Sequence, residues 1–142
     1  MPRHLNLIAL LTLAACGSDP LLDRIATHTV TVGELQVHTA FGLPPFTDAP
    51  MPVYFTVHNA GEDDILLGAD SPLGSGVAVH GAGMAEVAVI PVPARGEAVL
   101  APGGLHLMLL PPLPAIVRGD SVEVTLRFAL NGRVTLQVPV ID

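Results

Sequence analysis

Apolar and polar residues alternate with a period of two along most of this chain, and that pattern limits the possible folds more than any other feature. Val53, Phe55 and Val57 are separated by more polar residues, and residues 121–128 repeat the pattern. Alternation places every second side chain on the same face of a β-strand. No window keeps the spacing of a helix, and no internal repeat is visible. The pattern therefore predicts an all-β protein of about nine short strands, arranged as a two-sheet antiparallel sandwich.

Turn-forming residues divide the chain into these short segments. The sequence contains 14 Gly and 14 Pro in 142 residues, and both residue types interrupt strands and favour turns. Gly33-Glu34 separates two alternating runs within residues 29–38, which predicts a hairpin, and Asn131-Gly132 predicts another. The length and the continuous pattern predict one domain over residues 28–142.

The charged residues exclude several classes of function. Lysine is absent, and six arginines against 13 acidic residues give a net charge of −7. Such a balance disfavours nucleic acid or an anionic surface as a partner, and the lack of lysine removes P-loop and Schiff-base chemistry. Gly74-Ser75-Gly76 lacks the spacing of a nucleophile elbow, and Asp63 and Asp64 follow a turn, where we expect solvated loop charge. We therefore expect that the protein is not an enzyme.

The N-terminus has the features of a targeting segment. Arg3 precedes an apolar stretch at residues 5–13, which is too short to span a bilayer and fits a signal peptide over residues 1–15. It leads into Leu13-Ala14-Ala15-Cys16, which resembles a bacterial lipobox, in which the cysteine becomes the lipidated first residue of the mature protein. The alternative is an ordinary signal peptide followed by a chance cysteine. We predict a lipid anchor on Cys16.

The predicted anchor sets the location of the protein. Cys16 is the only cysteine, so no disulfide is expected in the exported domain. Residues 16–27 are predicted to be a tether, and the eleven residues after Cys16 would reach roughly 35 Å if they were extended. The domain would face the periplasm of a bacterial cell envelope, and Gly17 after the cysteine slightly favours the outer membrane.

The most unusual stretch is residues 102–110, PGGLHLMLL. Period-two geometry places His106 and Met108 on the same strand face, which makes the stretch either a filled core or half of a metal site. His80 and Met84 flank the flexible bend Gly81-Ala82-Gly83, which would let both side chains turn toward one point. Two imidazoles and two thioethers would suit Cu(I), but methionine also fills gaps in cores and a lone histidine is often structural.

The residues 54–138 resemble the PCu(A)C family of periplasmic copper chaperones. The matching segments are YFTVHNAG at residues 54–61, Ser71-Pro72, and LAPGGLHLML at residues 100–109. The motif of that family is His-x10-Met-x21-His-x-Met. Here 21 residues separate Met84 from His106, and one residue separates His106 from Met108, so three of the four ligands are in register.

The chain departs from the family pattern in the first half of the motif. Only three residues separate His80 from Met84, as if the hairpin between the two ligands had been shortened by seven residues. The tryptophan that family members often carry upstream is missing, and Phe41 is the residue that could replace it. We expect no His- and Met-rich tail after Asp142. The soluble members lack a lipid anchor, so Cys16 would mark a tethered variant.

The other histidines and Met51 receive simpler interpretations. His58 is expected on the polar face of its strand, and Met51, between two prolines, is expected to pack. His28 and His38 could approach each other across the first hairpin and hold Cu(II) weakly, although surface histidine pairs are common.

The resemblance implies both a fold and a function. It implies a cupredoxin-like antiparallel Greek-key β-sandwich that binds copper, most simply Cu(I), through His80, Met84, His106 and Met108. The protein would pass the ion to a copper-accepting partner, in the family the CuA centre of cytochrome c oxidase or its assembly factors. The alternative is a metal-free envelope lipoprotein that acts as an adhesion or assembly module.

Overall fold

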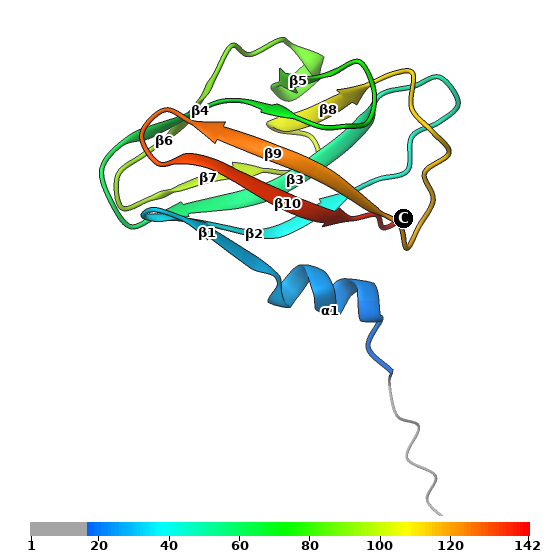
Figure 1. Ribbon diagram of the computed structural model, residues 1–142, viewed down its shortest axis with the longest axis horizontal. Coiled ribbons are helices and arrows are strands. Elements are labelled where there is room, and N and C mark those ends of the chain that lie inside the picture. Colours follow the sequence, from blue (N-terminus) through cyan, green and yellow to red (C-terminus); the bar gives the residue numbers. More distant parts are fainter. Residues whose placement is uncertain (1–16) are drawn as a thin grey trace, which may run out of the picture.

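The computed structural model describes residues 17–142, and the predicted signal peptide and Cys16 lie outside the described residues. Two β-sheets pack face to face in this part of the chain, with a short helix beside them (Figure 1). The prediction of an all-β antiparallel sandwich is confirmed. The strands of the described residues are β1 (Thr29–Val32), β2 (Leu35–Gly42), β3 (Met51–Asn59), β4 (Asp64–Asp70), β5 (Gly76–His80), β6 (Ile90–Val92), β7 (Glu97–Leu100), β8 (His106–Leu110), β9 (Ser121–Phe128) and β10 (Gly132–Pro139).

The first sheet has the strand order β1-β2-β3-β8-β5, with β7 also paired to β3. The long strand β3 lies at its centre because its first residues pair with β8 and its last residues pair with β7. The second sheet has the order β10-β9-β4-β6. All named strand pairs are antiparallel, and several join strands that are distant in sequence, such as β3–β8 and β4–β9. These crossovers give the sandwich its Greek-key character.

The core lies between the two sheets and follows the alternation of the sequence. On β3 the inward residues Val53, Phe55 and Val57 are almost completely buried. They face the apolar residues of the second sheet, among them Val124 and Leu126 of β9. The other face of β3 is the outer face of the first sheet, and there it carries Tyr54, Thr56 and His58. The candidate ligands of β8 lie on this outer face, because Met108 is paired with Pro52 of β3.

A helix occupies most of the segment that was predicted to be a tether. Helix α1 (Pro20–Thr27) contacts β2 and β10, so residues 20–27 do not form an extended chain. Asp19 caps its N-terminus, since its carboxylate accepts a hydrogen bond from the backbone N–H of Leu21 at 3.0 Å. Pro20 at the first helical position adds a favourable φ. The expectation that no segment is helical was wrong here, although the Asp-Pro pair was a visible helix-start signal.

Buried polar side chains fix the turns at one end of the sandwich. Asn59, at 0% exposure, donates hydrogen bonds to the carbonyls of Glu62 and Val92. Asp64 is also buried, and it accepts hydrogen bonds from the backbone of Ile65 and Leu130 and from both nitrogens of Asn131. The expectation of solvated charge at Asp64 was therefore wrong, whereas Asp63 is exposed.

The hydrogen bonds around Asp64 also change its acidity. Burial alone would raise the pKa of this carboxyl, but the bonds from Asn131, Leu130 and Ile65 outweigh burial, so the pKa lies below its ordinary value. The carboxylate thus ties the start of β4 to the turn between β9 and β10. Among residues 17–142, no helix is long and apolar enough to cross a membrane.

Candidate metal centre

His80 and His106 face each other on the outer face of the first sheet. They are directly opposite in the antiparallel pairing of β5 with β8. Their ring centroids are 5.6 Å apart, and the ring planes meet at 83°. The two imidazoles, 26 residues apart in sequence, are thereby held side by side on rigid strands.

The ring of His106 is oriented by the turn that precedes β8. Its Nδ1 lies 2.8 Å from the carbonyl oxygen of Gly104, and because a carbonyl only accepts, Nδ1 carries the proton. The turn itself is closed by hydrogen bonds from Ala101 N–H to Leu105 O and from Gly104 N–H to Ala101 O. This arrangement leaves the Nε2 lone pair of His106 free to bind a ligand, as is usual for metal-binding histidines.

His80 has a buried polar atom without a partner. Its Nδ1 is shielded from solvent and makes no hydrogen bond with any residue that the structure describes. An unpaired buried nitrogen is unfavourable by about 1–3 kcal/mol, so such atoms are rare in native proteins. A metal ion at this nitrogen would remove the penalty, so the unpaired atom is consistent with a ligand position.

Both methionines line the same cavity as His106. The cavity has a volume of about 370 Å³, and its walls include Met84, Met108, Pro52 and Tyr54. Met108 is 7% exposed and stands between Pro52 of β3 and Ala78 of β5, whose small side chain leaves room beside the thioether. Met84 is 53% exposed at the mouth of the site. His80 contacts the site through the ring of His106.

The shortened segment between His80 and Met84 forms a tight turn. Gly81 N–H donates to Ala85 O at 2.8 Å, and His80 is bridged to Glu86 on the returning chain. Gly83 and Met84 both have left-handed backbone conformations, with φ of 68° and 63°. A left-handed methionine is strained by roughly 1–2 kcal/mol, and strain of this kind concentrates at functional sites. The turn brings Met84 back to the cavity despite the missing residues.

Aromatic rings extend from the histidines across the sheet. Tyr54 lies 6.2 Å from the ring of His106, and Phe41 lies 5.1 Å from Tyr54. Burial raises the pKa of the Tyr54 hydroxyl. Phe41 therefore supports the site through its contact with the ring of Tyr54. The sequence did not single out Tyr54; the period-two pattern put it on one strand face, but the pairing of β3 with its neighbours decided what it would meet.

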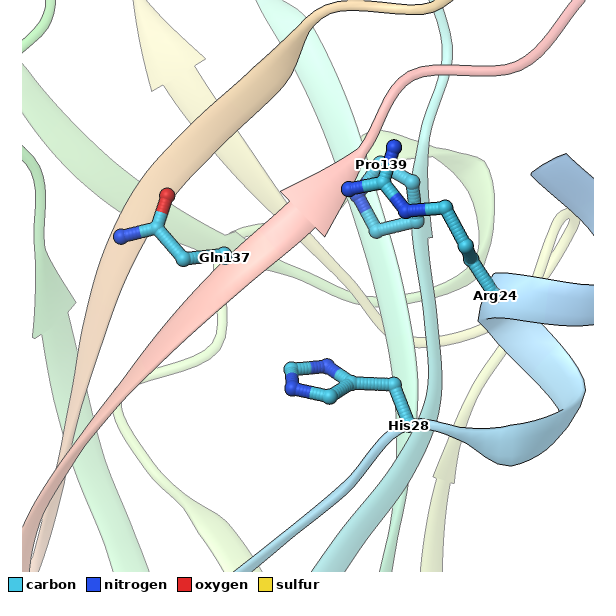
Figure 2. A pocket seen from close by; sticks show the side chains of 4 residues that line it. All are labelled: Arg24, His28, Gln137 and Pro139. Carbon is cyan, nitrogen blue, oxygen red and sulfur yellow. The ribbon is translucent and has the colours of Figure 1, made fainter.

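The remaining candidates lie away from this cavity. His58 lies 3.8 Å from Glu97 on the exposed face, and Met51 is a buried core residue, as expected. His38 is paired with Thr29, so alternation directs the adjacent His28 to the opposite face, which does not favour a His28–His38 pair. His28 instead lines a hollow between α1 and β10 with Arg24, Gln137 and Pro139 (Figure 2).

The four candidate ligands form a soft donor set. Among the described residues, no three His, Cys, Asp or Glu side chains gather at a point where they could hold a metal ion. Any site on this cavity therefore depends on the methionine thioethers together with the two imidazoles. Such donors fit Cu(I) and rank low for Mg²⁺ or Ca²⁺.

The solved structures that are similar to this chain include PCuAC domains. The copper-bound PCuAC domain from PmoF2 has a TM-score of 0.74 and 28% sequence identity, over 80% of this chain and 97% of that chain. The apo PCuAC domain from PmoF1 has the same TM-score and identity, over 81% and 98%. The solution structure of Cu(I)-bound DR1885 from Deinococcus radiodurans, at 22% identity, has the same fold with a TM-score of 0.61 over 86% of each chain. The sandwich is thus of the PCuAC class, which confirms the resemblance seen in the sequence.

The sequence also matches a family model. Residues 26–140 match the family described as "Putative lipoprotein LpqE-like". The chain belongs to the LpqE-like family. No curated protein sequence matches the chain significantly.

Proposed function

We propose that this protein binds one Cu(I) ion with His80, Met84, His106 and Met108 and passes it to another protein. The observation that carries the proposal is the in-register pair of His80 and His106, in which a buried Nδ1 of His80 lacks a partner. The thioethers on the same cavity supply the soft donors. The copper-bound neighbour from PmoF2 supports copper as the ion.

Transfer would proceed by ligand exchange. Met84 is the most exposed of the four ligands, so it is the first that an incoming donor would replace. A neutral thioether releases the ion more readily than a thiolate, because no charge is separated. His106, fixed by Gly104, would hold the ion until the partner has supplied its own ligands.

We propose that the recipient is the CuA centre of cytochrome c oxidase or one of its assembly factors. The chain would be held at the envelope by lipid on Cys16 and would face the periplasm, where such partners are found. The lipoprotein description of the family supports the anchor. The choice between inner and outer membrane stays a prediction.

A Cu(I) titration tests the proposal. Tyr54 is the only tyrosine and tryptophan is absent, so the intrinsic fluorescence comes from a residue that lines the cavity. We expect Cu(I) to change Tyr54 emission with one equivalent and to be held against a competing chelator. Zn²⁺ should have little effect. A protein that takes up no copper in either measurement would contradict the proposal and favour the metal-free assembly module.

A further inference from the structure

We propose that one end of the sandwich rests on the lipid bilayer. This apolar end consists of the loop at residues 43–50 and the loop at residues 111–118, which lie at the right of Figure 1. Three features of the described residues favour this contact: exposed apolar side chains, the position of the N-terminal end of α1, and the charges around it.

Large hydrophobic side chains are exposed to solvent at the apolar end. Phe46 is 88% exposed and Val117 is 60% exposed, and both line one hollow together with Pro45, Leu113 and Pro114. The first loop is closed by a hydrogen bond from Ala49 N–H to Phe46 O at 3.0 Å. A phenylalanine presented on a proline-framed loop, next to further apolar residues, indicates a surface that is covered in use.

The start of α1 brings the predicted anchor to this same end. Asp19, the N-cap residue, forms an ion pair with Arg118, which follows Val117 directly. Arg118 is also paired with Asp142, with Nε and Oδ1 3.2 Å apart. Because only two residues separate Cys16 from Asp19, the Cα atom of the lipidated cysteine can lie at most about 11 Å from that of Asp19. An anchor on Cys16 would therefore hold the apolar end near the bilayer surface.

The charges favour a bilayer over a second copy of the chain. The guanidinium of Arg118 is shared by two carboxylates, and none of the described residues that line the hollow around Phe46 is cationic. Asp48 is exposed on its rim. Two copies with a net charge of −7 would repel each other, whereas a bilayer of zwitterionic lipids would not. The contact would be apolar and independent of anionic lipid, unlike that of a polybasic segment.

Docking would also orient the candidate metal centre. Phe46 lines a second hollow, which includes Pro52 and Met108, and these two residues line the metal cavity as well. The cavity would then open beside the bilayer surface, where a membrane-bound acceptor could reach it. This consequence depends on the proposed function, but the docking itself does not.

Single tryptophans provide the test, because the chain has none of its own. Phe46→Trp places the reporter at the apolar end. Leu130→Trp is the matched control, because Leu130 is 64% exposed and lies in the turn between β9 and β10, at the other end of the sandwich (Figure 1). Both variants, as lipidated mature proteins that begin at Cys16, are reconstituted into vesicles of phosphatidylethanolamine and phosphatidylcholine, with and without brominated acyl chains.

We expect the emission of Phe46→Trp to shift to shorter wavelength on the vesicles and to be quenched by the brominated lipids, with Leu130→Trp unchanged. If the two tryptophans showed the same emission wavelength and the same quenching on the vesicles, the proposal would be overturned. A shift of the Phe46→Trp emission to shorter wavelength in the absence of vesicles, in a protein that sediments as a dimer, would also overturn it. The surface would then bind a second copy of the chain. A chain that carries no lipid on Cys16 would overturn it too. Copper is not needed, so failure of the copper titration cannot be confused with failure of docking.

Discussion

His80 and His106 meet across the β5–β8 ladder with their rings 5.6 Å apart, although the shortened turn after His80 could have moved it out of reach. We therefore expect both imidazoles in the first shell of bound copper. In His80→Ala, copper X-ray absorption should lose one imidazole contribution. His58→Ala, which removes a histidine on the exposed face, should leave the spectrum unchanged. An unaltered spectrum in His80→Ala would exclude His80 as a ligand and leave a three-ligand site.

Met108→Leu separates copper binding from packing. Leucine has nearly the same volume, so the free energy of unfolding should fall by less than about 1.5 kcal/mol. The thioether is lost, so Cu(I) affinity in chelator competition should fall at least tenfold, a loss of about 1.4 kcal/mol of binding free energy. The control is Met51→Leu, since Met51 is completely buried between the sheets and should affect packing only. Equal Cu(I) affinity in Met108→Leu and the wild type would remove Met108 from the site.

Gly83→Val tests the turn that returns Met84 to the cavity. Gly83 has a φ of 68°, and a Cβ added there meets no atom within 4 Å, so the whole effect is backbone strain. We expect lower Cu(I) affinity and a loss of roughly 1–2 kcal/mol in stability. Gly119→Val is a matched control, because Gly119 also has a positive φ and open space around it but lies outside the cavity. It should lose stability and keep its copper affinity. Equal losses of Cu(I) affinity in Gly83→Val and Gly119→Val would mean that backbone strain lowers the affinity through the fold as a whole, and not through the turn that carries Met84.

Asp64→Asn should destabilise the fold in a pH-dependent way. The amide has a single acceptor oxygen, so it can keep the two bonds from Asn131 or the two bonds from Ile65 and Leu130, but not both pairs. We expect a loss of about 2 kcal/mol at neutral pH. The pKa of Asp64 is lower in the fold than its ordinary value of 3.8, so the ionised carboxylate stabilises the fold above that pH. As pH falls through the folded-state pKa, this contribution is lost. The stability difference between wild type and Asp64→Asn should therefore narrow below about pH 4 in urea unfolding. If the stability difference between wild type and Asp64→Asn did not change with pH, the stabilising role of the Asp64 carboxylate would be contradicted.

Cys16→Ser tests the anchor. If Cys16 carries lipid, the substituted protein should move from the membrane pellet to the soluble periplasmic fraction. Its circular dichroism and its copper affinity should match those of the wild-type domain, because Cys16 precedes the first residue of the sandwich by more than ten positions. Continued pelleting of Cys16→Ser with membranes would show that Cys16 is not the anchor.

Local patterns in the sequence were sufficient to predict the strands and half of the candidate metal site. Period-two alternation predicted the sandwich, the first hairpin and the shared face of His106 and Met108, because side-chain direction along a strand depends only on the strand itself. The spacing of the PCu(A)C motif added Met84. The short helix α1 was missed because eight residues carry too few turns for a helical period to be visible, and its stability comes from the Asp19 cap and from packing on β2 and β10.

The tertiary structure alone decided which side chains meet. Nothing local to β5 or β8 specifies that His80 lies opposite His106, that the tilted ring of Tyr54 lies near that of His106, or that Asp64 is bonded to Asn131. Register and strand order arise when both sheets bury their apolar faces at once, so they depend on residues throughout the chain. The sequence thus determined the donor atoms and the faces they occupy, while packing of the two sheets determined their partners, because contact between strands distant in sequence is a property of the whole core.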